Sequence, residues 1–388
     1  MTEPSAEQFG GVLAAPMPRQ RRGDIAAMVG AALAVALAAV ALTIAIHRAP
    51  PRGLIATLSG PGGQATCSAA FSPDGTTLAV AGCNDSVFLW DVTTRRWIAT
   101  LASPGCPDGG QVVFSPDGAT LALFSGRDPT TCLWQVAARR ETTLTDPGPR
   151  AQLYFDGTQG AFSPSGMTLA VADSNGNIYL WDLATRRVTT TVPASAGPVA
   201  FSPDGTMLAV GDSEGSADHV TVWDLAARRR TVTFTDPSGN SVSGAGVSSL
   251  AFNRDGILAV GDMDGRAYLW DVATRALTAT IAPPINMAQG NASISKDGQP
   301  YPVAGAFPQD VNAAVSPDGT MLAADVDFGY GTCLYDVTTR NRLATLTDPG
   351  GQPNQAGQVA FSPDGTMIAV TDSNGRTYLW HVPHPQRR

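Results

Sequence analysis

The chain of 388 residues contains few side chains that could carry a catalytic reaction. A nucleophilic triad needs a histidine base beside a serine or cysteine, and the chain has only four histidines: His47, His219, His381 and His384. His219 follows a polar segment, and His381 and His384 lie near the C-terminus. We interpret these histidines as solvated. We therefore expect that the protein is not an enzyme and has no catalytic or cofactor-binding residues.

Three short acidic segments resemble fragments of calcium-binding loops: residues 173–176, 262–265 and 372–375. None has the twelve-residue ligand spacing or the terminal glutamate of an EF-hand. All three fall at the same place in a repeated pattern, where Asn-Gly and Asp-Gly favour a hairpin turn for backbone reasons alone. We therefore predict turns at these positions and no metal site.

The repeated pattern gives the architecture. A Phe-Ser-Pro-Asp-Gly turn or a variant of it occurs seven times, and an aromatic residue follows each turn after 18 to 22 residues. The turns begin at Phe71, Phe114, Phe162, Phe201, Phe252, Val315 and Phe361. The aromatic residues are Trp90, Trp134, Trp181, Trp223, Trp270, Tyr335 and Trp380, and we predict that all seven are core residues between packed sheets. A period of about 40–50 residues built from short strands is typical of a β-propeller.

The first repeat shows how one blade forms. Strands are expected at residues 66–71, 77–81, 87–92 and 97–101, separated by turns rich in Gly, Pro, Asn and Asp. Four antiparallel strands make one propeller blade. The last repeat lacks its fourth strand, whereas residues 54–58 form a strand of the right type with no blade before it. We predict that residues 54–58 complete the last blade as a latch, which leaves no unpaired edge.

The turns and the Trp-Asp pairs at 90–91, 181–182, 223–224 and 270–271 resemble those of bacterial WD-repeat proteins over residues 53–388. The resemblance implies an all-β, seven-bladed propeller, and by analogy a protein-binding or scaffolding role. The chain departs from the family because the Gly-His pair before the first strand is absent from every repeat. The family's hydrogen-bonded histidine network therefore cannot form here.

The N-terminal segment is expected to anchor the chain in a membrane. Residues 1–24 form a polar, basic tail, and residues 25–46 contain no charge. These 22 residues would reach about 33 Å as a helix, enough to cross a hydrocarbon core of about 30 Å. Residues 47–53 then link this single span to the propeller at 54–388. A cleaved signal peptide and a twin-arginine export signal at Arg21-Arg22 are the alternatives.

Charge gives the expected surroundings of the propeller. Residues 53–388 carry 20 Lys and Arg against 30 Asp and Glu, a formal charge of −10, so we exclude nucleic acid as a partner. Three arginines precede the span and two follow it, which gives only a slight positive-inside bias. A short basic N-terminus usually stays inside, so we expect the propeller outside the cytoplasm.

The five cysteines are consistent with export. Cys67, Cys83, Cys106 and Cys132 lie in two adjacent blades and near the same face of the predicted propeller. The first pairing to consider is Cys67–Cys83 with Cys106–Cys132, which leaves Cys333 unpaired. Isolated buried thiols are an equally weighted alternative.

The two faces of the predicted propeller differ. One carries the Phe-Ser-Pro-Asp-Gly turns and a second set of turns rich in arginine. These arginines could be solvated charges offset by the turn aspartates, or they could contact anionic lipid weakly. The arginines are Arg95, Arg96, Arg139, Arg140, Arg186, Arg187, Arg228, Arg229, Arg230, Arg275, Arg340 and Arg342. The other face carries the long loops, where aromatic and charged residues could bind a protein partner or could instead pack their own loops. These residues are Arg150, Tyr154, Phe155, Tyr301, Phe307 and Asp310.

These observations favour a membrane-anchored, non-catalytic scaffold whose protein partner is unknown. One alternative is an extracytoplasmic enzyme or small-ligand binder that uses the central channel. It would need convergent carboxylates or histidines on the first strands, which carry mostly Ala, Val and Ser. Another alternative is a sensor that signals through a recruited partner.

Overall fold

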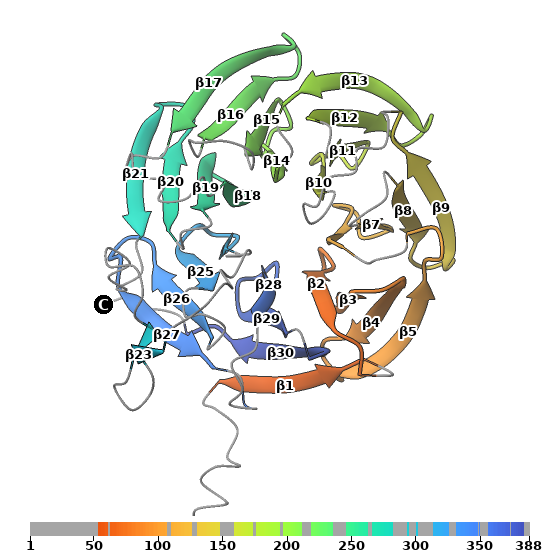
Figure 1. Cartoon of the computed structure of the whole chain (residues 1–388), viewed down its shortest axis with the longest axis vertical. Coiled ribbons are helices and arrows are strands. Elements are labelled where there is room, and N and C mark those ends of the chain that lie inside the picture. Colours follow the sequence, from red (N-terminus) through yellow and green to blue (C-terminus); the bar gives the residue numbers. More distant parts are fainter. Residues whose placement is uncertain are drawn as a thin grey trace, which may run out of the picture. The chain divides into compact units, whose positions relative to one another are not determined.

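The protein forms a ring of seven four-stranded antiparallel sheets, as a β-propeller requires (Figure 1). The computed structural model describes residues 53–60, 63–106, 110–125, 130–147, 159–173, 176–194, 197–211, 219–235, 246–262, 266–281, 293–294, 300–301, 313–325, 331–347, 349, 356–372 and 374–383. Residues 51–388 form one compact unit. Residues 25–46, the predicted membrane span, lie outside the described ranges. Within those ranges, no helix is long and apolar enough to cross a bilayer.

The first four blades follow one another in the chain. Blade 1 contains β2 (Thr66–Phe71), β3 (Thr77–Gly82), β4 (Ser86–Asp91) and β5 (Arg96–Ala102). Blade 2 contains β6 (Val112–Phe114), β7 (Thr120–Phe124), β8 (Thr130–Gln135) and β9 (Arg140–Thr145). Blade 3 contains β10 (Gln159–Phe162), β11 (Thr168–Ala172), β12 (Asn177–Asp182) and β13 (Arg187–Pro193). Blade 4 contains β14 (Val199–Phe201), β15 (Met207–Gly211), β16 (His219–Asp224) and β17 (Arg229–Thr235).

The remaining three blades complete the ring. Blade 5 contains β18 (Val247–Phe252), β19 (Ile257–Asp262), β20 (Ala267–Asp271) and β21 (Ala276–Ile281). Blade 6 contains β24 (Ala313–Val315), β25 (Met321–Asp325), β26 (Thr332–Asp336) and β27 (Arg342–Leu346). Blade 7 contains β28 (Ala356–Phe361), β29 (Met367–Asp372), β30 (Arg376–His381) and β1 (Leu54–Ser59). A short hairpin of β22 (Ser293–Ile294) and β23 (Pro300–Tyr301) lies between blades 5 and 6 in the sequence.

The latch closes the ring at blade 7. β1 pairs antiparallel with β30, from Leu54 opposite Trp380 to Ser59 opposite Arg376. The N–H of His381 donates to the carbonyl of Gly53 at 2.8 Å and extends this pairing by one bond. On the inner side of the ring, β2 contacts β28 and β29, so blade 1 also packs on blade 7. The predicted seal between the two ends of the propeller is therefore present.

The Ser-Pro-Asp-Gly turns form because each residue type supplies one part of the geometry. In blade 1 the hydroxyl of Ser72 donates to Asp74 Oδ1 at 2.6 Å, and the N–H of Gly75 donates to the carbonyl of Ser72 at 2.8 Å. Gly75 has a φ of 72°, a conformation that glycine adopts without steric cost. The same bond between serine and aspartate recurs in blades 2, 4, 6 and 7. In blade 3 Ser165 takes the place of the aspartate, and in blade 5 Asn253 takes the place of the serine.

The core of each blade centres on an aliphatic residue rather than on the repeated aromatic. The second strand places a leucine or isoleucine directly opposite each aromatic, and all seven of these residues are almost fully buried: Leu78, Leu121, Leu169, Leu208, Leu258, Leu322 and Ile368. Trp134, Trp181, Tyr335 and Trp380 are buried as predicted. Trp90, Trp223 and Trp270 are only half-buried, but each packs against a core cluster between blades.

Candidate interaction surface on the arginine face

One face of the ring carries two kinds of turn. Because antiparallel strands alternate in direction, the turns between the first and second strands and those between the third and fourth strands lie at the same end of every blade. We call this end the arginine face, because the second kind of turn ends in one or more arginines. The turn between β4 and β5, residues 91–96, represents it.

The β4–β5 turn is held by its first residue. The carboxylate of Asp91 accepts hydrogen bonds from the N–H of Thr94 at 2.6 Å and from the Thr94 hydroxyl at 2.8 Å. The carbonyl of Asp91 accepts from the N–H of Arg95 at 2.8 Å. Arg95 must then adopt a φ of 60° to return the chain into β5. In this turn the aspartate cap is thus followed by a left-handed arginine.

The left-handed arginine recurs in six blades. The only non-glycine residues with positive φ in the described part of the chain are Arg95, Arg139, Arg186, Arg228, Arg275 and Arg340, with φ between 50° and 60°. A side chain in this region costs roughly 1 kcal/mol or more, and glycine or asparagine would avoid most of that strain. Unfavourable backbone geometry that recurs at equivalent positions points to a function for the side chain.

The arginine side chains of these turns and of the strands that follow them are exposed and uncommitted. In the described ranges, no hydrogen bond or ion pair engages the side chains of Arg95, Arg96, Arg139, Arg140, Arg186, Arg187, Arg228, Arg229, Arg275, Arg340 and Arg342. Arg230 differs from these arginines because it makes a cation–π contact: its guanidinium carbon lies 5.8 Å from the centre of the Trp223 ring. The face therefore presents free cations from six neighbouring blades.

The aspartates of this face are used within the turns. A hydrogen bond from Ser72, together with bonds from Thr76, holds the pKa of Asp74 below its ordinary value. Bonds from the backbone and the hydroxyl of Thr94 do the same for the pKa of Asp91. Asp117, Asp204 and Asp364 repeat the first arrangement, and each has a lowered pKa chiefly because a serine hydroxyl donates to it. These carboxylates stay ionised, but they cap N–H and O–H groups rather than pair with the arginines.

Large apolar side chains are also exposed near this face. Four are exposed within the described ranges: Trp97 (51%), Ile98, Met167 (66%) and Leu277. Each lies within three residues of a left-handed Arg or Gly of the arginine-face turns. Cations beside an exposed indole and aliphatic side chains are typical of surfaces that contact the headgroup region of a bilayer.

A comparison with protein-family models identifies the repeats. The model described as "WD domain, G-beta repeat" matches residues 52–91, 158–182, 233–271 and 344–381. The chain carries WD40 repeats. Each matched segment ends on the third strand of a blade, and three of the four begin at or near the outer strand of the blade before it. A search of curated proteins found no match to the chain.

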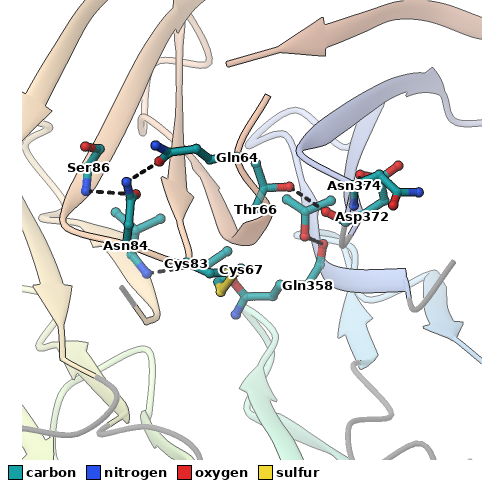
Figure 2. Close-up of a disulfide and its surroundings, with 12 residues drawn as sticks. Gln64, Thr66, Cys67, Cys83, Asn84, Ser86, Gln358, Asp372 and Asn374 are labelled. Atoms are coloured by element: carbon teal, nitrogen blue, oxygen red, sulfur yellow. Dashed lines mark hydrogen bonds between the residues drawn. A yellow bond between two sulfur atoms is a disulfide. The ribbon is translucent and has the colours of Figure 1, made fainter. Parts of the chain in front are cut away.

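The WD40 propeller contains two disulfides on the face opposite the arginines. They join Cys67 to Cys83 and Cys106 to Cys132, with Cα–Cα distances of 5.1 Å and 6.1 Å, and they are the pairs that the sequence analysis considered first. Cys333 is buried and unpaired. Figure 2 shows that the first disulfide lies beside Gln358 and Asp372 of blade 7, at the seam of the ring. There the hydroxyl of Thr66 donates to the Asp372 carbonyl at 2.9 Å (Figure 2).

The predicted protein-binding residues are mostly not described. Arg150, Tyr154, Phe155, Phe307 and Asp310 lie outside the described residues, and of Tyr301 only the backbone of strand β23 is described. The prediction of a protein-binding site on these loops therefore stays a prediction.

The acidic segments that resemble calcium loops act as hairpin caps where they are described. Asp173 Oδ1 accepts from the N–H of Asn177, and Asp372 Oδ1 accepts from the N–H groups of Asn374 and Arg376. Among the residues that the structure describes, no three His, Cys, Asp or Glu side chains are placed to hold a metal ion. His219 begins β16, and His381 is exposed at the end of β30.

Sequence reasoning missed a polar contact between blades. Trp181 Nε1 donates to Asp146 Oδ1 at 3.2 Å, across the junction of blades 2 and 3. The pKa of Asp146 is raised to about 7, chiefly because the carboxyl is buried; the bond from Trp181 opposes this rise, and the nearby charge of Asp173 adds a smaller one. Asp146 Oδ2 is buried without a partner. A Thr-Asp-Pro sequence at 145–147, repeated at 235–237 and 347–349, was the available signal.

Proposed function

We propose that the protein is a non-catalytic binding and scaffolding propeller, held at a membrane by residues 25–46 and placed on the extracytoplasmic side. The observation that carries the proposal is the arginine face, where free and conformationally strained arginines from six blades lie beside exposed Trp97 and Met167. WD40 propellers are rigid platforms whose usual role is to bind other proteins. A platform with one cationic face suits a role at an anionic surface.

The disulfides support the extracytoplasmic placement. Structural disulfides persist in oxidising compartments and are rare in a reducing cytosol. Cys106 and Cys132 are fully buried, so a reductant would reach their disulfide only through local opening of the blade.

The chain direction supports membrane contact through the arginine face. β1 enters blade 7 as its fourth strand, so it begins at the end of the blade where the third-to-fourth-strand turns lie. The seven residues 47–53 can span at most about 25 Å. A propeller tethered so closely at this end would hold its arginines near anionic headgroups, each contributing about 1 kcal/mol to attraction at the surface. The long loops of the other face, with Arg150, Tyr154 and Phe155, would remain open to a protein partner.

Hydrogen exchange on the full-length protein in nanodiscs tests the membrane contact. We expect slower exchange of the arginine-face turns, such as 91–96, in nanodiscs with anionic lipid than in neutral ones, and loss of that difference at high salt. The opposite-face hairpin at 82–86 provides the internal control. Equal exchange of the arginine-face turns in both lipids would contradict the contact.

Protease and proximity labelling in intact cells test the placement and the role. We expect added protease to cleave the propeller and not the N-terminal tail, and we expect labelling from the propeller to enrich proteins of the same compartment. Labelling of cytosolic proteins, with a propeller protected from protease, would contradict the extracytoplasmic scaffold.

A further inference from the structure

The two disulfides of the propeller differ in their exposure to solvent. Cys106 and Cys132 are both 0% exposed, so a thiol can reach their sulfur atoms only after local opening of the fold. Cys83 is exposed and Cys67 is partly exposed. Because thiol–disulfide exchange requires a thiolate to reach a sulfur atom, access favours the first disulfide over the second.

The Cys67–Cys83 disulfide joins an irregular part of blade 1. The register of β2 with β3 shifts between Thr66 and Ser68, so Cys67 is the extra residue of a β-bulge. Cys83 is the first residue of the turn between β3 and β4, and its N–H donates to the carbonyl of Ala65 at 2.9 Å. The disulfide therefore ties the bulge to the turn, outside the regular ladder of the blade.

The residues on either side of Cys67 hold the seam between blades 1 and 7. The hydroxyl of Thr66 donates to the carbonyl of Asp372 at 2.9 Å, and the hydroxyl of Ser68 donates to Gln358 Oε1. Figure 2 shows Gln358 and Asp372 beside the disulfide. Because Cys67 lies between these two hydroxyl residues in the chain, a change at the bulge acts directly on contacts that close the ring.

Exposure also decides which sulfur atom is the target. Exposed disulfides are the labile and regulatory ones, whereas structural disulfides resist reduction. Cys106–Cys132 has the burial of a structural disulfide, and Cys67–Cys83 does not. Within the exposed pair, Cys83 is the more accessible residue, so attack at its sulfur atom makes Cys67 the leaving group.

We propose that Cys67–Cys83 is a thiol-exchange site at the seam of the ring. A thiolate of a second molecule attacks Cys83 Sγ, a new S–S bond forms, the Cys67–Cys83 bond breaks, and Cys67 leaves as a thiolate that takes up a proton. A small monothiol stops at this mixed disulfide. A protein dithiol goes further, because its second thiolate attacks its own sulfur in the mixed disulfide, releases Cys83 as a thiol and leaves the dithiol oxidised.

The first test treats the folded, full-length protein in detergent with reduced glutathione. Free thiols are then alkylated, and the products are mapped by peptide mass spectrometry. We expect glutathione on Cys83 and an alkylated Cys67, formed at least about tenfold faster than any product of Cys106–Cys132, because the buried pair must first open. Equal rates for the two disulfides, glutathione mainly on Cys67, or no product at Cys83 would overturn the proposal.

A second probe distinguishes the source of the thiol. A thioredoxin whose second active-site cysteine is replaced by serine cannot resolve the mixed disulfide, so it stays attached to the cysteine that it attacks. Capture of Cys83 faster than by glutathione, at equal thiolate concentration, assigns the exchange to a protein dithiol. Slower capture assigns it to a small thiol. Capture of Cys106 or Cys132 at a comparable rate would contradict a site at Cys83.

Hydrogen exchange tests the link to the seam. The double variant Cys67→Ser, Cys83→Ser removes the exposed disulfide, and Cys106→Ser, Cys132→Ser is the matched control. We expect the first variant to exchange faster in β2 and β28, measured against β15 of blade 4, and the control to show no such local change. Wild-type protein that has reacted with glutathione gives the same comparison if the variant fails to fold. Equal changes in β2 and β15 would refute the link.

Discussion

Replacing the left-handed arginines by asparagine should stabilise the propeller while weakening its contact with an anionic membrane. The triple variant Arg95→Asn, Arg139→Asn and Arg186→Asn changes three residues with φ of 60°, 50° and 55°. Asparagine tolerates this conformation better than arginine, which gives a gain of roughly 0.5–1 kcal/mol at each site. The three turns share no side-chain partners, so the gains should add to about 2 kcal/mol.

Thermal unfolding in detergent measures the gain. For a domain of this size, about 2 kcal/mol corresponds to a rise in Tm of roughly 3 °C. The matched control changes the next residue of each turn instead: Arg96→Asn, Arg140→Asn and Arg187→Asn. These residues begin strands β5, β9 and β13 and have no positive φ. The control removes the same three charges, but asparagine is a poor strand residue, so its Tm should stay level or fall slightly.

The membrane contact should respond to both triple variants alike. Each loses three arginines worth about 1 kcal/mol apiece near anionic lipid, so binding should weaken by about two orders of magnitude. Equal Tm values for the two triple variants would refute the claim that the left-handed arginines are strained. Unchanged protection of the turns in anionic nanodiscs would refute the claim that these arginines contact the membrane.

Three further predictions concern the ring, its disulfides and one buried acid. Leu58→Ala in the latch should lower the free energy of unfolding by about 2–4 kcal/mol, because the Leu58 side chain is only 4% exposed. The control Thr57→Ala changes an exposed residue of the same strand and should alter this free energy little. Equal effects of the two variants in chemical denaturation would contradict the latch packing. Thiol titration of the unfolded, unreduced protein should find one free thiol, and five free thiols would exclude both disulfides. The double variant Cys106→Ser, Cys132→Ser should have a free energy of unfolding lower by about 3 kcal/mol. The pKa of Asp146 is raised to about 7 in the folded protein and is near 4 in the unfolded chain, so the folded state binds the extra proton and stability falls as pH rises from about 4 to about 7. Asp146→Asn keeps an acceptor for the indole and should flatten this decline by a few kcal/mol at most, and an unchanged pH profile of the Tm would argue against the raised pKa.

The repeats predicted the fold because each blade uses the same local chemistry. Ser72, Asp74 and Gly75 build a turn from adjacent residues, so the sequence alone shows where the hairpins lie. The last repeat lacks a fourth strand, and one strand of that type precedes the first repeat. These two observations predicted the latch, because pairing the extra strand with the incomplete blade closes the ring. The membrane span and the sidedness of the propeller remain predictions.

The candidate surfaces were less accessible to sequence reasoning, because they depend on backbone angles and on contacts between blades. The arginines were found as a charge pattern, but their positive φ is a property of the folded turn, which the spacing of residues does not show. Trp181 and Trp223 look alike in sequence. The indole of Trp181 donates to Asp146 of the neighbouring blade, whereas the Nε1 of Trp223 has no partner among the described residues. Trp90 was expected in the core because of its type, and it packs against a core cluster while remaining only partly buried.

β1 is the first strand of the propeller to be synthesised and its partner β30 is the last, so the two can pair only when the propeller is almost fully synthesised. A ribosome that adds about 5–20 residues per second needs tens of seconds or more to reach Arg376 after Leu54 has emerged. During that interval β1 has no partner, and six blades can assemble only as an open arc whose two ends expose unpaired surfaces. A chain truncated before Arg376 could not close the ring. We therefore expect truncated products to aggregate rather than merely to lack activity.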